Sequence, residues 1–222
     1  MGNLPDWVYG LIVWIGGCVV VGGGLALWRR LRLRRLERTT SARGWRYRAE
    51  APELVGVSQG PPFGPLGARV TGVVEGREHG REFVAFRYQR DDPSSGEGTS
   101  TSRFGVVAFP LPFSGVPVVH VSTRADAAAW SLPAWQPAPT GLEAFDRERT
   151  VLTTRPETAR ALLTPALAEL VLAHPAWVWR VDDHALLVLR RRREFDAAEL
   201  ERVVAFGAAV LDHLEPALRA SH

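Results

Sequence analysis

Residues 177–214 read WVWRVDDHALLVLRRRREFDAAELERVVAFGAAVLDHL, and this stretch determines the fold class of the chain. Two apolar segments, 177–181 and 185–191, flank the turn-forming triplet Asp182-Asp183-His184, a pattern typical of a β-hairpin. Asp196 with Glu199 then provides a helix start signal. Apolar residues recur at helical spacing along one face of the helix that follows: Leu200, Val203, Val204, Gly207, Leu211 and Leu214. The order indicates a sheet with a helix packed against it.

The residues before this hairpin predict another strand and another helix. Residues 141–153 favour a strand, with Phe145, Val151 and Leu152 as its apolar members. Thr154-Arg155-Pro156-Glu157 has the form of a capping box with proline early in the helix. The helix is expected to continue to about Ala173 with a break at Thr164-Pro165, where the start signal recurs.

Extended segments dominate the first half of the chain. Residues 68–90 predict a hairpin around a glycine-containing turn at 75–80. Two more strands are expected at 103–111 and 116–122, near the edges of the sheet because prolines accompany them. Residues 91–102, DDPSSGEGTSTS, form a polar segment that cannot bury apolar area, so we expect a disordered loop.

Together these patterns predict one soluble α+β domain over residues 44–222. Its sheet is expected to be mostly antiparallel, with two or three helices on one face. Residues 39–67 hold several Gly and Pro residues, and we interpret them as part tether and part packed extended chain.

The N-terminal segment favours a membrane anchor. Residues 7–28 are uncharged and, as a helix, would span roughly 33 Å, close to the hydrocarbon core of about 30 Å. Trp7 and Trp28 lie at its ends, where aromatic rings prefer the membrane interface. Six arginines follow at once in the basic juxtamembrane segment 29–43: Arg29, Arg30, Arg32, Arg34, Arg35 and Arg38. By the positive-inside rule, residues 1–6 lie outside and the C-terminal domain is cytoplasmic.

Three alternatives to a single-pass anchor are a signal peptide, a lipoprotein signal and a buried core helix. A signal peptide needs its positive charge before the apolar segment, and a lipoprotein signal at Cys18 lacks a basic region before it. A buried core helix conflicts with the arginines that follow. The arginines can also contact anionic lipid headgroups. Cys18, Gly22 and Ala26 form a small-xxx-small row that can support a homodimer.

Charge and cysteine content exclude other classes. The net charge is +3, and residues 29–38 alone carry six arginines and one glutamate, a net +5. The remainder is therefore about −2, which removes the main support for nucleic-acid binding. With one cysteine there is no disulfide framework and no multi-cysteine metal site.

No sequence motif predicts catalysis, a cofactor or a metal. Asp182, Asp183 and His184 are better explained as turn residues than as ligands of an ion. Nucleophile elbows and phosphate-binding glycine loops do not occur in the sequence. The most unusual feature of the domain is the run Arg190, Arg191, Arg192 and Arg193, which either ends a strand or contacts anionic lipid headgroups or an acidic partner.

Dispersed residues resemble those of a known family. They lie in VTGVVEGREHGREFVAFRYQR, in RFGVVAFPLP and in FDRERTVLTTRPETARALLTPALAELVLA, followed by the strand LLVLRR and a last helix. This arrangement resembles a family of uncharacterised, actinobacterial-type, single-pass membrane-anchored proteins with a C-terminal domain of unknown function. The resemblance covers most of residues 44–215. It implies the anchor and the α+β domain, and it implies no activity.

Two hypotheses about function follow. The first is a non-enzymatic, membrane-tethered cytoplasmic domain that binds a protein partner or a lipid surface. The alternative is a membrane-associated enzyme whose site is assembled from scattered residues such as His79, His120, Asp182 and His184. Convergence of those four side chains in one cleft would favour the enzyme.

Overall fold

The computed structural model describes residues 40–58, 60–64, 67–92, 100–112, 114–130, 132–191 and 195–220. The chain divides into two compact units, residues 1–43 and residues 44–222, and the fold described below is that of the second. Within the described ranges, no helix is both long and apolar enough to cross a bilayer. The predicted anchor at 7–28, the arginines at 29–38 and the row Cys18, Gly22 and Ala26 lie outside the described residues.

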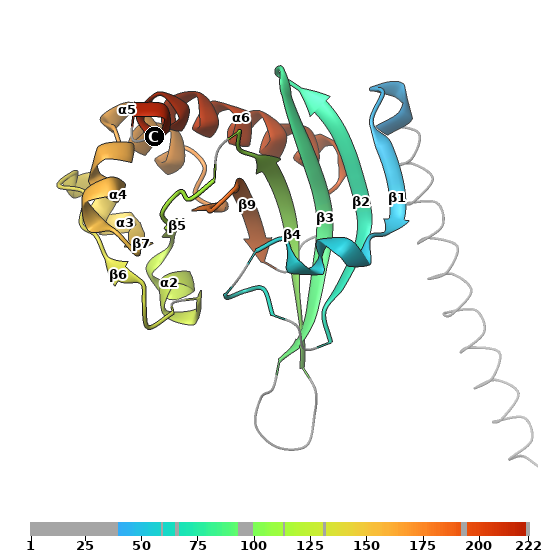
Figure 1. Cartoon of the computed structure of the whole chain (residues 1–222), viewed down its shortest axis with the longest axis horizontal. Coiled ribbons are helices and arrows are strands. Elements are labelled where there is room, and N and C mark those ends of the chain that lie inside the picture. The colour runs from blue at the N-terminus through green and yellow to red at the C-terminus, as the bar shows by residue number, and fades with distance from the viewer. Residues whose placement is uncertain are drawn as a thin grey trace, which may run out of the picture. The chain divides into compact units, whose positions relative to one another are not determined.

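A nine-stranded sheet forms the centre of the domain, in the order β1-β2-β3-β4-β9-β8-β5-β7-β6 (Figure 1). Every neighbouring pair of strands is antiparallel. The strands are β1 (Arg46–Glu50), β2 (Arg69–Glu78), β3 (Arg81–Asp92), β4 (Ser100–Pro110), β5 (Val119–Ser122), β6 (Gln136–Pro137), β7 (Thr150–Thr153), β8 (Val178–Asp182) and β9 (Ala185–Arg191).

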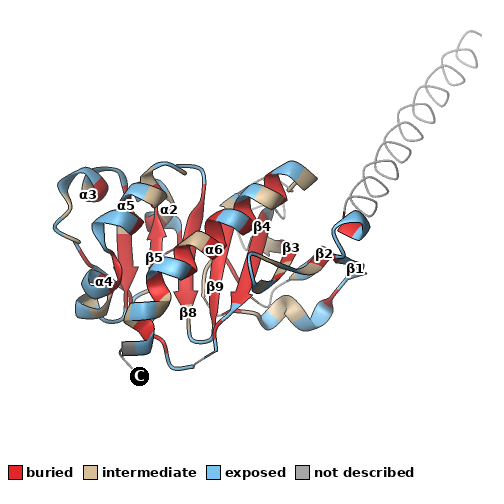
Figure 2. Ribbon diagram, turned by 90° about the horizontal axis from the view of Figure 1, so that it is seen from above, coloured by how far each residue is buried: buried red, intermediate tan, exposed pale blue. Residues whose placement is uncertain are grey.

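Helices lie on both faces of this sheet. They are the 3-10 helix η1 (Pro52–Gly56) and the α-helices α2 (Arg124–Trp130), α3 (Glu143–Glu148), α4 (Pro156–Leu162), α5 (Pro165–Leu172) and α6 (Ala197–Ala220). The long helix α6 contacts β3, β4 and β9 as well as α4 and α5, and Figure 2 shows it running across the strands. The face that α6 covers is called the α6 face below.

Alternation along the central strands assigns side chains to the two faces. Phe109 of β4 packs on the α6 face, where a Cβ added to Gly207 would overlap its ring. Phe104, Val106 and Ala108 have the opposite parity and belong to a second buried cluster. That cluster also contains Trp130 of α2, and Leu54 of η1 packs against it. The central strands are therefore buried on both sides, as their nearly continuous apolar sequence requires.

Local signals explain where the main helices start. The N-cap residue Asp196 accepts a hydrogen bond from the Glu199 amide at 2.8 Å. The Thr164 hydroxyl accepts one from the Leu167 amide at 3.3 Å and so caps α5. The predicted capping box at Thr154 does not form, because Arg155 occupies the N-cap position of α4 and makes no side-chain cap bond. The predicted break at Thr164-Pro165 is confirmed.

The predicted strand at 141–153 is wrong over most of its length. The structure has the helix α3 there, and only Thr150–Thr153 forms a strand. The Asp146 carboxylate accepts hydrogen bonds from the Thr140 and Gly141 amides, so it organises the turn that starts the helix. Phe145 is the buried residue of this helix, and charged residues stand on both sides of it in the sequence.

Three further expectations need correction. Proline did not mark β4 as an edge strand: β4 pairs with β3 and β9 in the middle of the sheet, and Pro110 only ends it. Helices cover both faces, and there are more of them than the two or three expected. The strands flanking the polar loop extend to Asp92 and from Ser100, so the predicted loop at 91–102 is too long, and residues 93–99 lie outside the described ranges.

Candidate functional site

A short segment between η1 and β2 crosses the sheet on the face opposite α6. This segment, called the strap, consists of Val57, Ser58 and residues 60–64. The Phe63 ring meets the Tyr88 ring edge-on at 4.9 Å. The Tyr88 hydroxyl accepts a hydrogen bond from the Gly64 amide at 2.9 Å and donates one to the Gly64 carbonyl at 2.7 Å. The strap is thus fixed to β3, and the face that it crosses is called the strap face below.

A fully buried arginine lies under the strap. Arg180 of β8 donates a hydrogen bond to the Pro61 carbonyl at 2.9 Å and another to the Ser58 hydroxyl. Its guanidinium lies 3.3 Å from the Asp182 carboxylate, which also accepts a hydrogen bond from the Ser58 hydroxyl. Burial lowers the pKa of Arg180 to about 10, against the opposing effect of Asp182. Arg180 therefore stays charged at neutral pH.

A buried histidine neighbours Arg180 across the strand pair. His120 of β5 is paired in register with Arg180 of β8, so both side chains lie on the strap face. Its ring lies 5.6 Å from the Trp135 ring and 6.0 Å from the Trp130 ring. Burial, aided by the Arg180 charge, lowers the pKa of His120 to about 3, so the imidazole is neutral at physiological pH.

Several polar atoms of this pair have no hydrogen-bond partner among the described residues. They are both ring nitrogens of His120 and the Nε of Arg180. A buried polar group without a partner costs free energy, about 1–3 kcal/mol, and so calls for an explanation. The pair and Ser58, Asp182 and the Pro61 carbonyl are called the polar cluster below.

An apolar groove of about 530 Å³ adjoins the polar cluster. It is lined by Ala127, Ala128, Leu132, Pro133, Trp135, Pro137 and Leu152. Trp135 belongs to both features, because its ring also lies 5.4 Å from the Arg180 guanidinium. Leu132 touches the strap, since a Cβ on Gly60 would overlap the Leu132 side chain. The groove, the strap and the polar cluster are therefore contiguous.

Two of the four predicted contact arginines have partners inside the domain. Arg190 forms an ion pair with Glu199 at the start of α6. Arg191 pairs with Asp126 at 3.1 Å, and its guanidinium lies 5.6 Å from the centre of the Trp130 ring. Arg192 and Arg193 lie outside the described residues. In this structure Arg190 and Arg191 join β9 to α6 and α2, and any lipid or partner contact by them remains a prediction.

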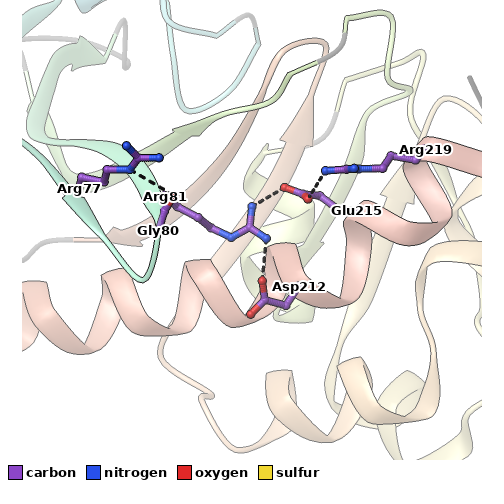
Figure 3. Close-up of polar contacts among 6 residues, drawn as sticks. All are labelled: Arg77, Gly80, Arg81, Asp212, Glu215 and Arg219. Atoms are coloured by element: carbon purple, nitrogen blue, oxygen red, sulfur yellow. Dashed lines mark hydrogen bonds and ion pairs between the residues drawn. The ribbon is translucent and has the colours of Figure 1, made fainter.

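A second ionic group joins the β2–β3 hairpin to the C-terminal half of α6 (Figure 3). Arg81 forms ion pairs with Asp212 at 2.6 Å and with Glu215, which also pairs with Arg219 at 3.1 Å. Arg77 is at the same hairpin but bonds only locally, from its Nε to the Gly80 carbonyl at 3.3 Å. The group holds the hairpin against the helix, and nothing in its geometry suggests chemistry.

The four residues of the enzyme hypothesis do not meet in one cleft. His79 lies at the tip of the β2–β3 hairpin, and the largely exposed His184 lies in the β8–β9 turn, 3.7 Å from Asp183. Asp183 accepts a hydrogen bond from the Gly115 amide, which supports the interpretation of these residues as a turn. Across the described ranges there is no group of three or more His, Cys, Asp or Glu residues that could hold a metal ion. His120 and Asp182 do share one neighbour, Arg180.

The sequence predicted His120 and Asp182 only as scattered candidates of an enzyme site, and no motif in it pointed to Arg180, Ser58 or the two tryptophans. One signal was available. Arg180 interrupts the otherwise apolar strand Trp177–Val181 next to a predicted turn. A charge inside a strand that is buried on both faces needs a partner, and that partner came from the strap, more than a hundred residues away.

Comparisons with known proteins support the fold. No family model and no curated protein matches the chain. A solved structure does match: the crystal structure of the mycobacterial trehalose monomycolate transport factor A, TtfA. The TM-score is 0.60 at 17% sequence identity, and the match covers 82% of this chain and 95% of that one. At this identity the likeness shows that the chain shares its fold with this actinobacterial protein.

Proposed function

We propose that this chain is a non-enzymatic accessory protein of a membrane transport system, tethered to the membrane by residues 7–28. The observation that carries the proposal is the fold likeness to TtfA, which extends over nearly the whole of that protein. Scattering of the candidate catalytic residues over separate turns and a buried strand agrees with an accessory role. In this proposal residues 44–222 lie in the cytoplasm and bind a protein of the transport system.

The arginines form a second part of the proposal. Arg29 to Arg38 would contact anionic headgroups beside the anchor, and Arg190 to Arg193 would add a contact from the domain. Arg191 is the best placed of the described pair, because its side chain is 41% exposed. The Cys18, Gly22 and Ala26 row would support a homodimer within the bilayer.

Cross-linking of the full-length chain in its native membrane, followed by mass spectrometry, tests the accessory role. We expect one reproducible membrane protein to be cross-linked to residues of the 44–222 domain. Recovery of lipids and copies of this chain alone would contradict the accessory role and leave a self-associating protein.

Replacement of Arg190, Arg191, Arg192 and Arg193 by Gln tests the lipid contact separately. Because Arg190 and Arg191 also hold internal ion pairs, a matched variant with only Arg192 and Arg193 replaced separates lipid contact from stability. In the 44–222 domain without the anchor, we expect both variants to be recovered less well with anionic vesicles by co-sedimentation. Unchanged recovery of a folded four-residue variant would exclude this contact.

A further inference from the structure

The polar cluster and the apolar groove have complementary properties that one ligand can satisfy. The unpartnered atoms of the pair include the Arg180 Nε–H, which is a donor, and the neutral His120 ring, which carries one N–H. Two donors beside a buried cation match the two oxygens of a carboxylate. A ligand with a neutral or cationic head group would not neutralise the Arg180 charge.

The groove supplies the apolar half of the same site. Its lining consists of alanine, leucine, proline and tryptophan side chains, and its volume of about 530 Å³ is within the range of about 300–1,000 Å³ usual for small-molecule sites. No side chain of the lining is charged, and apolar surface predominates in the groove. An alkyl chain is the matching chemistry.

Trp135 separates the two halves. Trp135 lines the groove, and its ring also packs against the Arg180 guanidinium and the His120 ring. It sits between proline-containing residues 132–134 and the two-residue strand β6, which pairs with β7 alone. A rotation of Trp135 away from the pair would join the groove to the polar cluster.

We propose that the groove and the His120–Arg180 pair form one binding site for a fatty-acid carboxylate, with Trp135 as the gate between chain and head. The alkyl chain lies in the groove along Ala128 and Leu132. The carboxylate replaces the Trp135 ring beside Arg180 and accepts hydrogen bonds from Arg180 Nε and His120. The site does not depend on the accessory role proposed above, because it rests on these residues alone.

Photolabelling of the full-length chain in phosphatidylcholine nanodiscs tests the site. The probe is a tetradecanoic acid that carries a diazirine on its chain, and the labelled peptides are mapped by mass spectrometry. We expect labels on residues 127–130 and 132–137, removed by excess myristate and retained with tetradecyltrimethylammonium or methyl myristate. Equal competition by all three amphipaths would overturn the assignment of the head, and labels scattered over the domain would overturn the site.

Two substitutions on one helix provide the matched control. Ala128→Trp fills the groove, whereas Ala129→Trp adds the same bulk to an exposed position of α2 outside the lining. We expect labelling to fall about tenfold or more in Ala128→Trp and to persist in Ala129→Trp. Equal labelling of the two variants would contradict the groove.

His120→Leu tests the polar end without depending on the groove variants. It places an apolar side chain of similar size between the two tryptophans and removes both ring nitrogens. We expect a folded protein, by circular dichroism, whose labelling falls at least severalfold and no longer distinguishes myristate from methyl myristate. Wild-type labelling and discrimination in the folded variant would show that His120 takes no part.

Discussion

The two faces of the sheet are buried to a similar extent but are built from different kinds of residue. On the α6 face, Phe83, Phe109, Leu186 and Val188 pack against an amphipathic helix whose buried residues are apolar except for Glu199, which pairs with Arg190. On the strap face, His120 and Arg180 are fully buried among tryptophans. Apolar burial dominates the first face, where the one buried carboxylate among the described residues of α6 is paired with Arg190, whereas the second face buries a guanidinium and an imidazole side by side.

This difference indicates a division of roles. Close packing of Phe109 against Gly207 contributes stability and leaves no room for a ligand. The strap face retains polar groups at a cost to stability, which is common where a protein binds something. We therefore interpret the α6 face as the scaffold and the strap face as the functional surface.

Arg180→Met should cause the largest loss of stability. The substitution leaves the Pro61 carbonyl without its donor and the half-buried Asp182 without its cation, and breaking such a buried pair costs about 3–5 kcal/mol. The free energy of unfolding from urea titration measures it. Arg103→Met, at an exposed position of β4, is the control and should change the value by less than about 0.5 kcal/mol. Similar losses in both variants would show that the strap does not depend on Arg180.

Acid should destabilise the protein through His120. Because the pKa of His120 is lowered to about 3 in the fold, the unfolded chain binds more protons at any pH between there and about 6.5. Stability from this group is complete above pH 6.5 and falls by up to about 1.4 kcal/mol per pH unit below it. Burial lowers the pKa of His174 as well, with the same sign.

His120→Leu isolates that contribution, since His174 is unchanged in it. Urea titrations from pH 7 to pH 4 should show a smaller slope in the variant than in the wild type. Identical slopes would mean that His120 titrates normally and is not desolvated as described.

Gly207→Val should destabilise through overpacking on the α6 face. A Cβ at this position overlaps the Phe109 ring, and forced rearrangements of this kind cost about 1–3 kcal/mol. Ala205→Val, at an exposed position of the same helix, is the control: valine in place of alanine costs less than about 0.7 kcal/mol of helix propensity, a penalty that valine in place of glycine does not carry. Thermal denaturation distinguishes them, and equal midpoints would argue against close contact of α6 with β4.

Arg81→Gln should have the smallest effect. It removes the ion pairs to Asp212 and Glu215 in Figure 3, of which Asp212 is largely exposed, so about 0.5–1 kcal/mol is expected. The loss should shrink in 1 M salt, because exposed pairs are screened. Arg77→Gln at the same hairpin lacks those partners and should be neutral. A larger loss from Arg77→Gln would assign the hairpin's attachment to another contact.

Sequence patterns predicted the elements of the α6 face well. The buried stripe of α6, the β8–β9 hairpin and the β2–β3 hairpin all follow from local periodicity, and the structure confirms them. The strap face depends on contacts between Ser58, His120 and Arg180, which are far apart in the sequence. No local pattern encodes which distant segment meets a buried charge, so the cluster could not be predicted. The helix α3 was missed because its apolar residues are too few to show a period.

The free energy of unfolding of His120→Leu at pH 7 shows whether His120 is needed for the fold. If His120 serves binding and not folding, the variant should be as stable as the wild type or more stable, since a buried group without a partner has been replaced by an apolar one. A loss of about 2 kcal/mol or more would contradict the account, because it would show that His120 is needed for the fold itself.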